Sequence, residues 1–474
     1  MSNFTKEPNE FDLLHDRSLV IVSVEKPEIA AFKSLGISIF NNMFMTCFKL
    51  ITTINLILLG HILYEGKVQY KLFITFQIGV FILEFLGKYF LIGLIKYVFG
   101  ENRDMKSLYN LYIKLKTALI FLIPLIIIPL SICSYYILKL IFKYALHLED
   151  SGLISEVYKK YLLPAIIMYF FEILFLLNLQ FLYKMKKLKL VFTYMISFLA
   201  CHAALSWILL FILNFGIFGI TISYCFNSLL FFFFSDRKIY RMVAGDAENY
   251  FYIIPNKNNF EWEILTNLKT ISYYSLINLG EVFIYQFVFL ASLFIDNNQL
   301  IVNIIYLNFF ELIIEINRGF YYTIKREIDS KYQDANDRQT YVQFFFLYYL
   351  ILSLIIFVTL LLFKYILLNI YIFQGGETIL KQIAGGLRII YSLCILFMGV
   401  KIILNGIARG INVQIPNERK VVYIFIFMFF SYLFSFFYDL GIFGLWLSML
   451  ILDILHIIEN AKKSRSFFYF GSRR

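Results

Sequence analysis

Acidic side chains inside long apolar runs are the residues of this chain best suited to chemistry. Glu281 stands in "NLGEVFIYQFVF", five residues before Gln286. A charged group at the depth of a bilayer is costly, so it faces water, a partner or a binding site. Desolvation favours the protonated acid, which lets Glu281 exchange a proton for a cationic substrate. A cation at Lys401, if it lies beside Glu281, would weaken proton binding and compete with that substrate. The alternative is a protonated Glu281 that hydrogen-bonds a neighbouring helix and never turns over.

Further charges are spaced to meet on one helix face. Glu311, Glu315 and Arg318 lie at i, i+4 and i+7 of an apolar run, a spacing that brings side chains together on a helix. Glu315 and Arg318 can form an ion pair, which leaves Glu311 as a second carboxylate for proton or substrate binding. Glu84 and Lys88, four residues apart, are interpreted as an internal ion pair.

Histidine and cysteine patterns give no catalytic or metal site. His202 stands alone on an apolar face, where hydrogen-bonded packing is the expected role. Asp453, His456 and Glu459 share a face of the last predicted helix, but Glu459 lies near its solvated end, so we expect no metal there. The five cysteines lie in apolar runs without a CxxC pair, which argues against a zinc site or a disulfide framework. With no nucleophile motif and no phosphate loop, the sequence predicts neither an enzyme nor a cofactor.

Composition defines the elements that must hold these residues. Apolar residues make up 60% of the chain and charged residues 16%, against about 45–50% and 25% in soluble domains. Apolar runs long enough to cross a bilayer as helices, roughly 20 residues each, recur along the whole length. The chain is therefore predicted to be an all-α integral membrane protein. We expect twelve spans, over 34–63, 71–99, 114–142, 161–182, 190–213, 217–235, 268–294, 298–322, 342–372, 384–408, 420–438 and 442–461.

A short repeat divides these spans into two halves. "NFGIFGI" (214–220) and "DLGIFGL" (439–445) stand 225 residues apart, and each opens the last span of a six-span half. Gly216, Gly219, Gly441 and Gly444 would allow a tight reversal and close helix approach there. Two parallel six-helix lobes related by a pseudo-two-fold axis enclose a central cavity. The expected units are a cytoplasmic tail (1–33), an N-lobe (34–235), a cytoplasmic linker (236–266), a C-lobe (267–461) and a second cytoplasmic tail (462–474).

Loop charges orient the bundle. Lys and Arg are retained on the cytoplasmic side of a membrane, and here the even-numbered loops and the C-terminal tail hold most of them. The odd-numbered loops have little beyond Lys67, Lys159, Lys160 and Lys381. Both termini are therefore predicted to be cytoplasmic. The net charge of +11 reflects this topology, and we expect no nucleic-acid partner. Whether the membrane is the plasma membrane or an internal one stays open.

Four stretches carry a family resemblance. They are "LLGHIL" at 58–63, "HAALSWILLFILNFGIFG" at 202–219, "GIARGINVQ" at 406–414 and "DLGIFGLWLSML" at 439–450. In their order and spacing, over nearly the whole chain, they resemble the multidrug and toxic compound extrusion (MATE) family in its eukaryotic form. The motif residues they carry are Gly60, His61, His202, Gly216, Gly219, Arg409, Gly410, Gln414, Gly441 and Gly444.

The resemblance also implies where coupling groups lie. Eukaryotic members place two glutamates five residues apart in the seventh helix and a third in the tenth; this chain has Glu281, Gln286 and Met398 at those places. Prokaryotic members often carry an aspartate five residues before the first-helix glycine, where this chain has Asn55. Glu281 is thus implied as the proton site, with Gln286 and Asn55 as further polar groups.

The resemblance implies a secondary antiporter that exports amphipathic, cationic organic compounds by alternating access. H⁺ is the expected coupling ion, with Na⁺ as the alternative, and we expect a monomer. A lipid-linked oligosaccharide flippase of the same superfamily is a second possibility, for which only Lys364, Lys401 and Arg409 could supply cations at depth. A third is a non-transporting membrane scaffold that has lost the coupling carboxylates. The substrate's identity stays open.

Overall fold

The computed structural model describes residues 26–41, 43–62, 67–84, 105–146, 151–242, 283–330, 335–372, 378–410 and 417–463, and in these ranges the regular structure is entirely helical. Glu281, Gln414 and Lys88 lie outside them. The helices are α2 (Pro27–Asn41), α3 (Met43–Ile62), α4 (Lys67–Leu83), α6 (Met105–Tyr144), α7 (Ser151–Val157), η2 (Tyr158–Leu162), α8 (Leu163–Lys184), α9 (Leu188–Trp207), η3 (Ile208–Ile212), α10 (Ile217–Met242), α13 (Asn297–Ser330), α14 (Ala335–Leu362), α15 (Ile366–Tyr371), α16 (Thr378–Gly410), α17 (Asn417–Ser431), η7 (Tyr432–Phe437) and α18 (Ile442–Lys463).

Each predicted span corresponds to a helix in the described ranges. Eight helices are long and apolar enough to cross a membrane, and four shorter apolar helices, Phe283–Ser292 among them, match the remaining spans. The chain is thus a multi-pass membrane protein. Several helices continue past the predicted limits: α6 begins at Met105 instead of 114, and α13 ends at Ser330 instead of 322. The residues at these ends are polar, so hydropathy does not show that the helices continue there. The helices can continue because a helix satisfies its own backbone groups outside the bilayer as well as inside it.

Helices α2 and α3 together cover the first predicted span, and residue 42 between them lies outside the described residues. Helix α2 begins at Pro27, whose fixed φ suits the first turn of a helix, so residues 27–33 of the predicted tail are helical. Ala31 is fully buried, and the two alanines Ala30 and Ala31 belong to a cluster with Phe320 of α13, Tyr341 of α14 and Ile403 of α16. The first helix of the described residues therefore packs against the second half of the chain.

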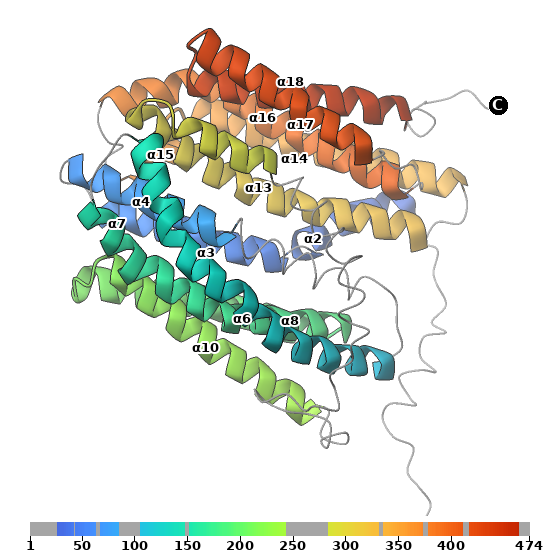
Figure 1. Ribbon diagram of the computed structural model, residues 1–474. Helices are drawn as coiled ribbons and strands as arrows, with labels where there is room; N and C mark the ends of the chain where they lie inside the picture. The colour runs from blue at the N-terminus through green and yellow to red at the C-terminus, as the bar shows by residue number, and fades with distance from the viewer. Residues whose placement is uncertain are drawn as a thin grey trace, which may run out of the picture.

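Figure 1 shows the helices arranged in two groups. Helices α6, α8 and α10 lie together on one side, with α8 packed against both of the others. Helices α13, α14, α16, α17 and α18 form the other group, in which α16 contacts both α13 and α18. Helices α3 and α4 lie between the groups and contact α13. This is the two-lobe arrangement that the repeat predicts.

The two glycine turns share one backbone conformation. Asn214 and Asp439 have φ of 55° and 54°, and Gly216 and Gly441 have φ of 57° and 56°, in the left-handed region where glycine is favoured. A π-helical segment, η3 or η7, precedes each turn. The same backbone hydrogen bonds recur with the offset of 225 residues: Leu213 N–H to Ile208 O, Phe215 N–H to Leu209 O and Gly219 N–H to Gly216 O match Tyr438 to Leu433, Leu440 to Phe434 and Gly444 to Gly441.

The second glycine of each turn allows close packing. A Cβ on Gly219 would lie 3.0 Å from the Cβ of Leu209, and one on Gly444 would lie 2.6 Å from the backbone of Phe434. Each π-helical segment thus packs against the first turn of the helix that follows it. The duplication that the sequence predicts is present down to individual hydrogen bonds.

Candidate functional site

Lys49 on α3 joins acidic residues from both halves of the chain. Its Nζ lies 2.9 Å from Oε2 of Glu84, which directly follows α4, and forms a second ion pair with Oε2 of Glu311 on α13. The three side chains are 5%, 8% and 9% exposed. Because two buried carboxylates share one ammonium, we call Lys49, Glu84 and Glu311 the inter-lobe triad.

The remaining carboxylate oxygens of the triad are also bound. Thr52 donates a hydrogen bond of 3.0 Å to Oε1 of Glu84. Gln286, one of the predicted site residues, donates its amide to Oε1 of Glu311 at 3.1 Å. Each acid therefore has a cation on one oxygen and a polar donor on the other, as buried ionised groups require.

The triad lies at mid-depth of the bundle. Lys49 is about 20 Å from the C-terminal end of α3, and Glu311 is about 20 Å from the start of α13, at 1.5 Å per residue. The two helices run antiparallel here, because Lys49 and Thr53 of α3 contact Glu311 and Asn308 of α13 in the opposite chain order. The two helix ends therefore lie at the same end of the bundle, and the triad lies about 20 Å from it.

One sequence-based pairing on α13 is confirmed, and one expectation about Glu311 is wrong. Glu315 and Arg318 form the predicted ion pair, at 2.5 Å. Glu311, predicted to be the freer acid, is instead bound to Lys49. Glu84 contacts Lys49 of the preceding helix, and its predicted partner Lys88 lies outside the described residues. Spacing within α13 did not indicate the pair that Glu311 makes, because its cation comes from α3.

Between the triad and the C-terminal end of α3, further contacts join α3 to the second half of the chain. Thr53 and Tyr371 both donate hydrogen bonds to Oδ1 of Asn308, at 2.8 and 2.6 Å. At the end of α3, the ring Nε2 of His61 lies 2.9 Å from the carbonyl oxygen of Ile370. A Cβ at Gly60 would lie 1.9 Å from the carbonyl oxygen of Tyr371. The motif pair Gly60–His61 therefore permits close approach of α3 to α15.

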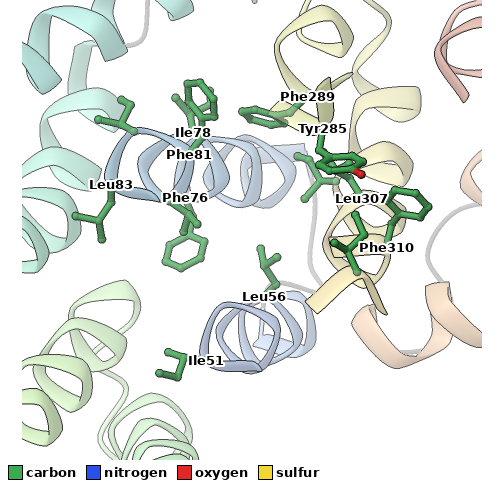
Figure 2. Close-up of a cluster of buried hydrophobic side chains, with 14 of the residues drawn as sticks. Ile51, Leu56, Phe76, Ile78, Phe81, Leu83, Tyr285, Phe289, Leu307 and Phe310 are labelled. Carbon is green, nitrogen blue, oxygen red and sulfur yellow. The ribbon is translucent and has the colours of Figure 1, made fainter. Parts of the chain in front are cut away.

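Apolar side chains surround this junction. Figure 2 shows Phe81 and Ile78 of α4 facing Phe289 and Tyr285 of the helix Phe283–Ser292. The ring centroids of Phe81 and Phe289 are 5.4 Å apart, and those of Tyr285 and Phe310 are 5.7 Å apart. The two lobes thus meet through aromatic rings as well as through the triad.

Asn55 and His202 form a separate polar cluster in the first half of the chain. The Nε2 of His202 lies 2.9 Å from Oδ1 of Asn55, and its Nδ1 lies 3.0 Å from Oγ of Ser223, whose hydroxyl also donates to the carbonyl oxygen of His202. All three side chains are buried. Both ring nitrogens are within hydrogen-bond distance of a polar atom, which is the hydrogen-bonded packing expected for His202.

Lys401 binds Asp453 of α18 in a buried ion pair. Glu281, which Lys401 would influence if the two lie side by side, is outside the described residues. Met398, at the tenth-helix place of the family carboxylate, is fully buried and accepts a hydrogen bond from Asn317 at 3.5 Å. Within the described residues, this part of α16 therefore holds a paired cation and a thioether.

The remaining motif residues have structural contacts. The guanidinium of Arg409 lies 5.6 Å from the ring centroid of Tyr321, and a Cβ on Gly410 would lie 3.0 Å from Ile328. Gln414 lies outside the described residues. Among the residues that the structure describes, no group of three or more His, Cys, Asp or Glu side chains is placed to hold a metal ion.

Two polar groups inside the first half were not anticipated. Lys116 of α6 forms an ion pair of 2.6 Å with Asp236 of α10, with side chains 2% and 0% exposed. Glu172 of α8 accepts a hydrogen bond from Tyr224 of α10. Lys116 and Asp236 tie the third predicted span to the end of the sixth, a pairing that no same-helix spacing could indicate.

Lys49 itself was the residue that sequence reasoning missed. It is the single charge in the run "NNMFMTCFKLITTINLILLG", inside the predicted first span. The rule that marks intramembrane charges as functional candidates applies to it as strongly as to Glu281. The signal for Lys49 was therefore present in the sequence, although its two partners were not.

Comparisons with known proteins bear on the fold. No protein-family model matches the chain, and no curated protein sequence matches it. The eukaryotic MATE transporter AtDTX14 superposes with a TM-score of 0.66 at 16% identity, over 93% of this chain and 99% of that one. A multidrug resistance MATE family transporter of the MOP superfamily, in an outward-facing conformation, gives 0.65 at 13%, over 93% and 96%.

A third solved structure is a MOP superfamily transporter from Pyrococcus furiosus, which superposes with a TM-score of 0.62 at 13% identity, over 94% of this chain and 97% of that one. Its binding pocket is described as having reversed polarity, which suggests a different function for that protein. At these identities the likeness shows the fold. The chain has the twelve-helix, two-lobe fold of MATE transporters.

Proposed function

We propose that this protein is a secondary transporter that exports amphipathic, cationic organic molecules in exchange for protons, by alternating access of its two lobes. The observation that carries the proposal is the inter-lobe triad, in which Lys49 is held between Glu84 and Glu311 near mid-depth of the bundle. The likeness to MATE transporters supports the transport class.

The triad offers a route to coupling. Lys49 is a cation already seated between two carboxylates, so a proton on Glu311 or a bound cationic substrate competes with it for the same acid. A ligand shifts a conformational equilibrium only by its different affinity for the two states. Protonation of Glu311 removes its attraction for Lys49 and loosens α3 from α13. The state in which the lobes separate at this level is thereby favoured.

Aromatic side chains supply the walls for an organic cation. Rings attract cations through their faces, with about 2 kcal/mol or more when the pair is desolvated. Phe81, Phe289, Tyr285 and Phe310 lie at the same junction of the lobes as the triad. Separation of α4 from the helix Phe283–Ser292 would expose these rings to a substrate.

Proteoliposome flux tests the proposal. The full-length protein is reconstituted, a pH gradient is imposed, and movement of a fluorescent organic cation is recorded for the parent and for Glu311→Gln. We expect gradient-driven flux in the parent and at least a tenfold loss in the variant, since one carboxylate that binds protons is gone. Glu156→Gln is the matched control, because Glu156 pairs with Lys160 on an exposed surface. Flux that ignores the gradient would contradict antiport.

Glu281 stays a prediction of the family resemblance. The same flux assay with Glu281→Gln asks whether that residue carries the proton instead of Glu311. Loss of coupling in Glu281→Gln with full coupling in Glu311→Gln would assign the proton to Glu281 and leave the triad as a mechanical link only.

We also propose that both termini lie on the cytoplasmic side of the membrane. Lys67, at the start of α4, and Ser330, at the end of α13, would then face opposite sides of the membrane. Single cysteines introduced at the two positions should react with an impermeant thiol reagent from opposite sides. Reaction of both from the same side would reject the orientation.

A further inference from the structure

A small pocket with two basic residues lies at the end of the bundle where α14 ends, α15 lies and α16 begins. It is a shallow, partly open hollow lined by Lys364, in the turn between α14 and α15, by Arg388 of α16, by Tyr306 and Tyr391, and by the apolar side chains of Leu360, Phe363, Ile366 and Leu367. An opening of this kind suits one compact polar group that enters from outside, with an apolar neighbour.

Arg388 has an unsatisfied hydrogen-bond donor that a ligand could bind. Its Nε is buried and makes no hydrogen bond within the described part of the chain, and no carboxylate in that part pairs with Arg388 or Lys364. Since both basic residues line one pocket, a single anionic group could satisfy both.

The backbone of α16 makes room for Lys364. A Cβ on Gly385 would lie 2.6 Å from the Cε of Lys364 and 3.4 Å from its Nζ. Gly385 and Arg388 are three residues apart and therefore lie on one face of α16. The side chain of Lys364 thus lies directly on Gly385, and it lines the same pocket as Arg388.

The depth and surroundings of the pocket match those of lipid headgroups. Helix α16 has 33 residues, or about 50 Å, so it extends beyond a hydrocarbon core of about 30 Å. Arg388 is about 15 Å from its start, close to the edge of the hydrocarbon, where long basic side chains reach headgroups. Phe363 and Ile389, beside the two cations, are 57% and 55% exposed, as expected for side chains that face lipid tails.

We propose that the pocket lined by Lys364 and Arg388 binds the phosphate of an anionic phospholipid, whose acyl chains lie against the apolar surface beside Phe363 and Ile389. Basic pockets between transmembrane helices are known to accept lipid headgroups. The guanidinium provides paired donors that match phosphate geometry, and the ammonium adds a second charge. This site is independent of the inter-lobe triad and of the transport proposal.

Binding of fluorescent phosphatidylglycerol to the purified full-length protein in neutral detergent tests this site. Arg388→Gln should weaken binding at least tenfold, since a charge-assisted hydrogen bond contributes about 1.5–3 kcal/mol, and Arg388→Lys should weaken it less. Lys381→Gln is the matched control, because it removes the same charge from α16 outside the pocket. Gly385→Ala should also weaken binding, because both charges remain but Lys364 must move.

Two controls separate lipid binding from misfolding and from binding of free phosphate. All variants are compared as monodisperse samples with the parent's melting temperature in neutral detergent, so that misfolding does not pass for lost binding. Inorganic phosphate and phosphatidylcholine serve as competitors, and neither should displace phosphatidylglycerol at equal concentration. Binding to Arg388→Gln as tight as to the parent would overturn the site. Displacement by inorganic phosphate as effective as by lipid would overturn the assignment to a phospholipid.

Discussion

The energetic link between Lys49 and Glu311 can be measured with a double-mutant cycle. Lys49→Met keeps the length of the side chain and removes its charge, which leaves Glu84 and Glu311 facing the place that the ammonium occupied. Removing one partner of a buried ion pair costs about 3–5 kcal/mol, and here two buried acids lose the same partner. We therefore expect a loss in the upper part of that range at pH 7.

Glu311→Gln is expected to cost less, about 1–3 kcal/mol, because Lys49 keeps Glu84 as an ionic partner. In the double variant, the neutral amide that replaces the carboxylate of Glu311 no longer repels Glu84, so part of the penalty of Lys49→Met disappears. The predicted coupling free energy is about 2 kcal/mol, within the range for residues in contact. The measurement is the free energy of unfolding in mixed micelles, titrated with a denaturing detergent, for the parent, the two single variants and the double variant.

The pH dependence of the cycle tests its electrostatic origin. When pH falls from 7 to 5, the carboxylates left unneutralised by Lys49→Met take up protons, so the penalty of that substitution should shrink. Glu156→Gln is the control, since Glu156 and Lys160 are 44% and 53% exposed and an exposed pair contributes about 1 kcal/mol at most. The link between the lobes would be refuted if the costs of the two single variants add up to the cost of the double variant to within about 0.5 kcal/mol.

Two sets of substitutions test the repeat and the buried pair of the N-lobe. Gly216→Ala and Gly441→Ala should each cost about 1–2 kcal/mol, from the left-handed backbone, but Gly441→Ala should lower the melting temperature further, because its Cβ would meet Oε1 of Gln299 at 2.1 Å; equal losses would contradict the packing at Gly441. Lys116→Met should destabilise by about 3–5 kcal/mol, and adding Asp236→Asn should restore most of this. If Lys116→Met leaves the melting curve unchanged, the pair contributes nothing.

The sequence predicted the spans and the repeat because their signals are local. An apolar run of about 20 residues identifies a membrane helix almost by itself, and the glycines of the two turns are required by backbone conformation. The limits of helices such as α6 and α13 were less predictable. Their polar ends carry no hydropathy signal, although the backbone continues as a helix.

The site was less predictable because its partners come from different helices. Spacing on one helix indicated the pair of Glu315 with Arg318, which forms. The same reasoning left Glu311 without a partner, whereas it binds Lys49. It also gave no sign that Glu84 would bind Lys49 of another helix; Lys88, the partner it assigned to Glu84, lies outside the described residues. Such contacts depend on how α3, α4 and α13 pack, and this packing is set by the whole bundle.

The position of α2 has a consequence for how the chain reaches its native state. This helix precedes α13, α14 and α16 in the chain, yet these three helices form the surface that covers Ala30 and Ala31. That surface is complete only after the second half of the chain has been synthesised. Burial of α2 therefore depends on assembly with the second half of the chain. Protection of α2 from a protease would report that both halves have assembled.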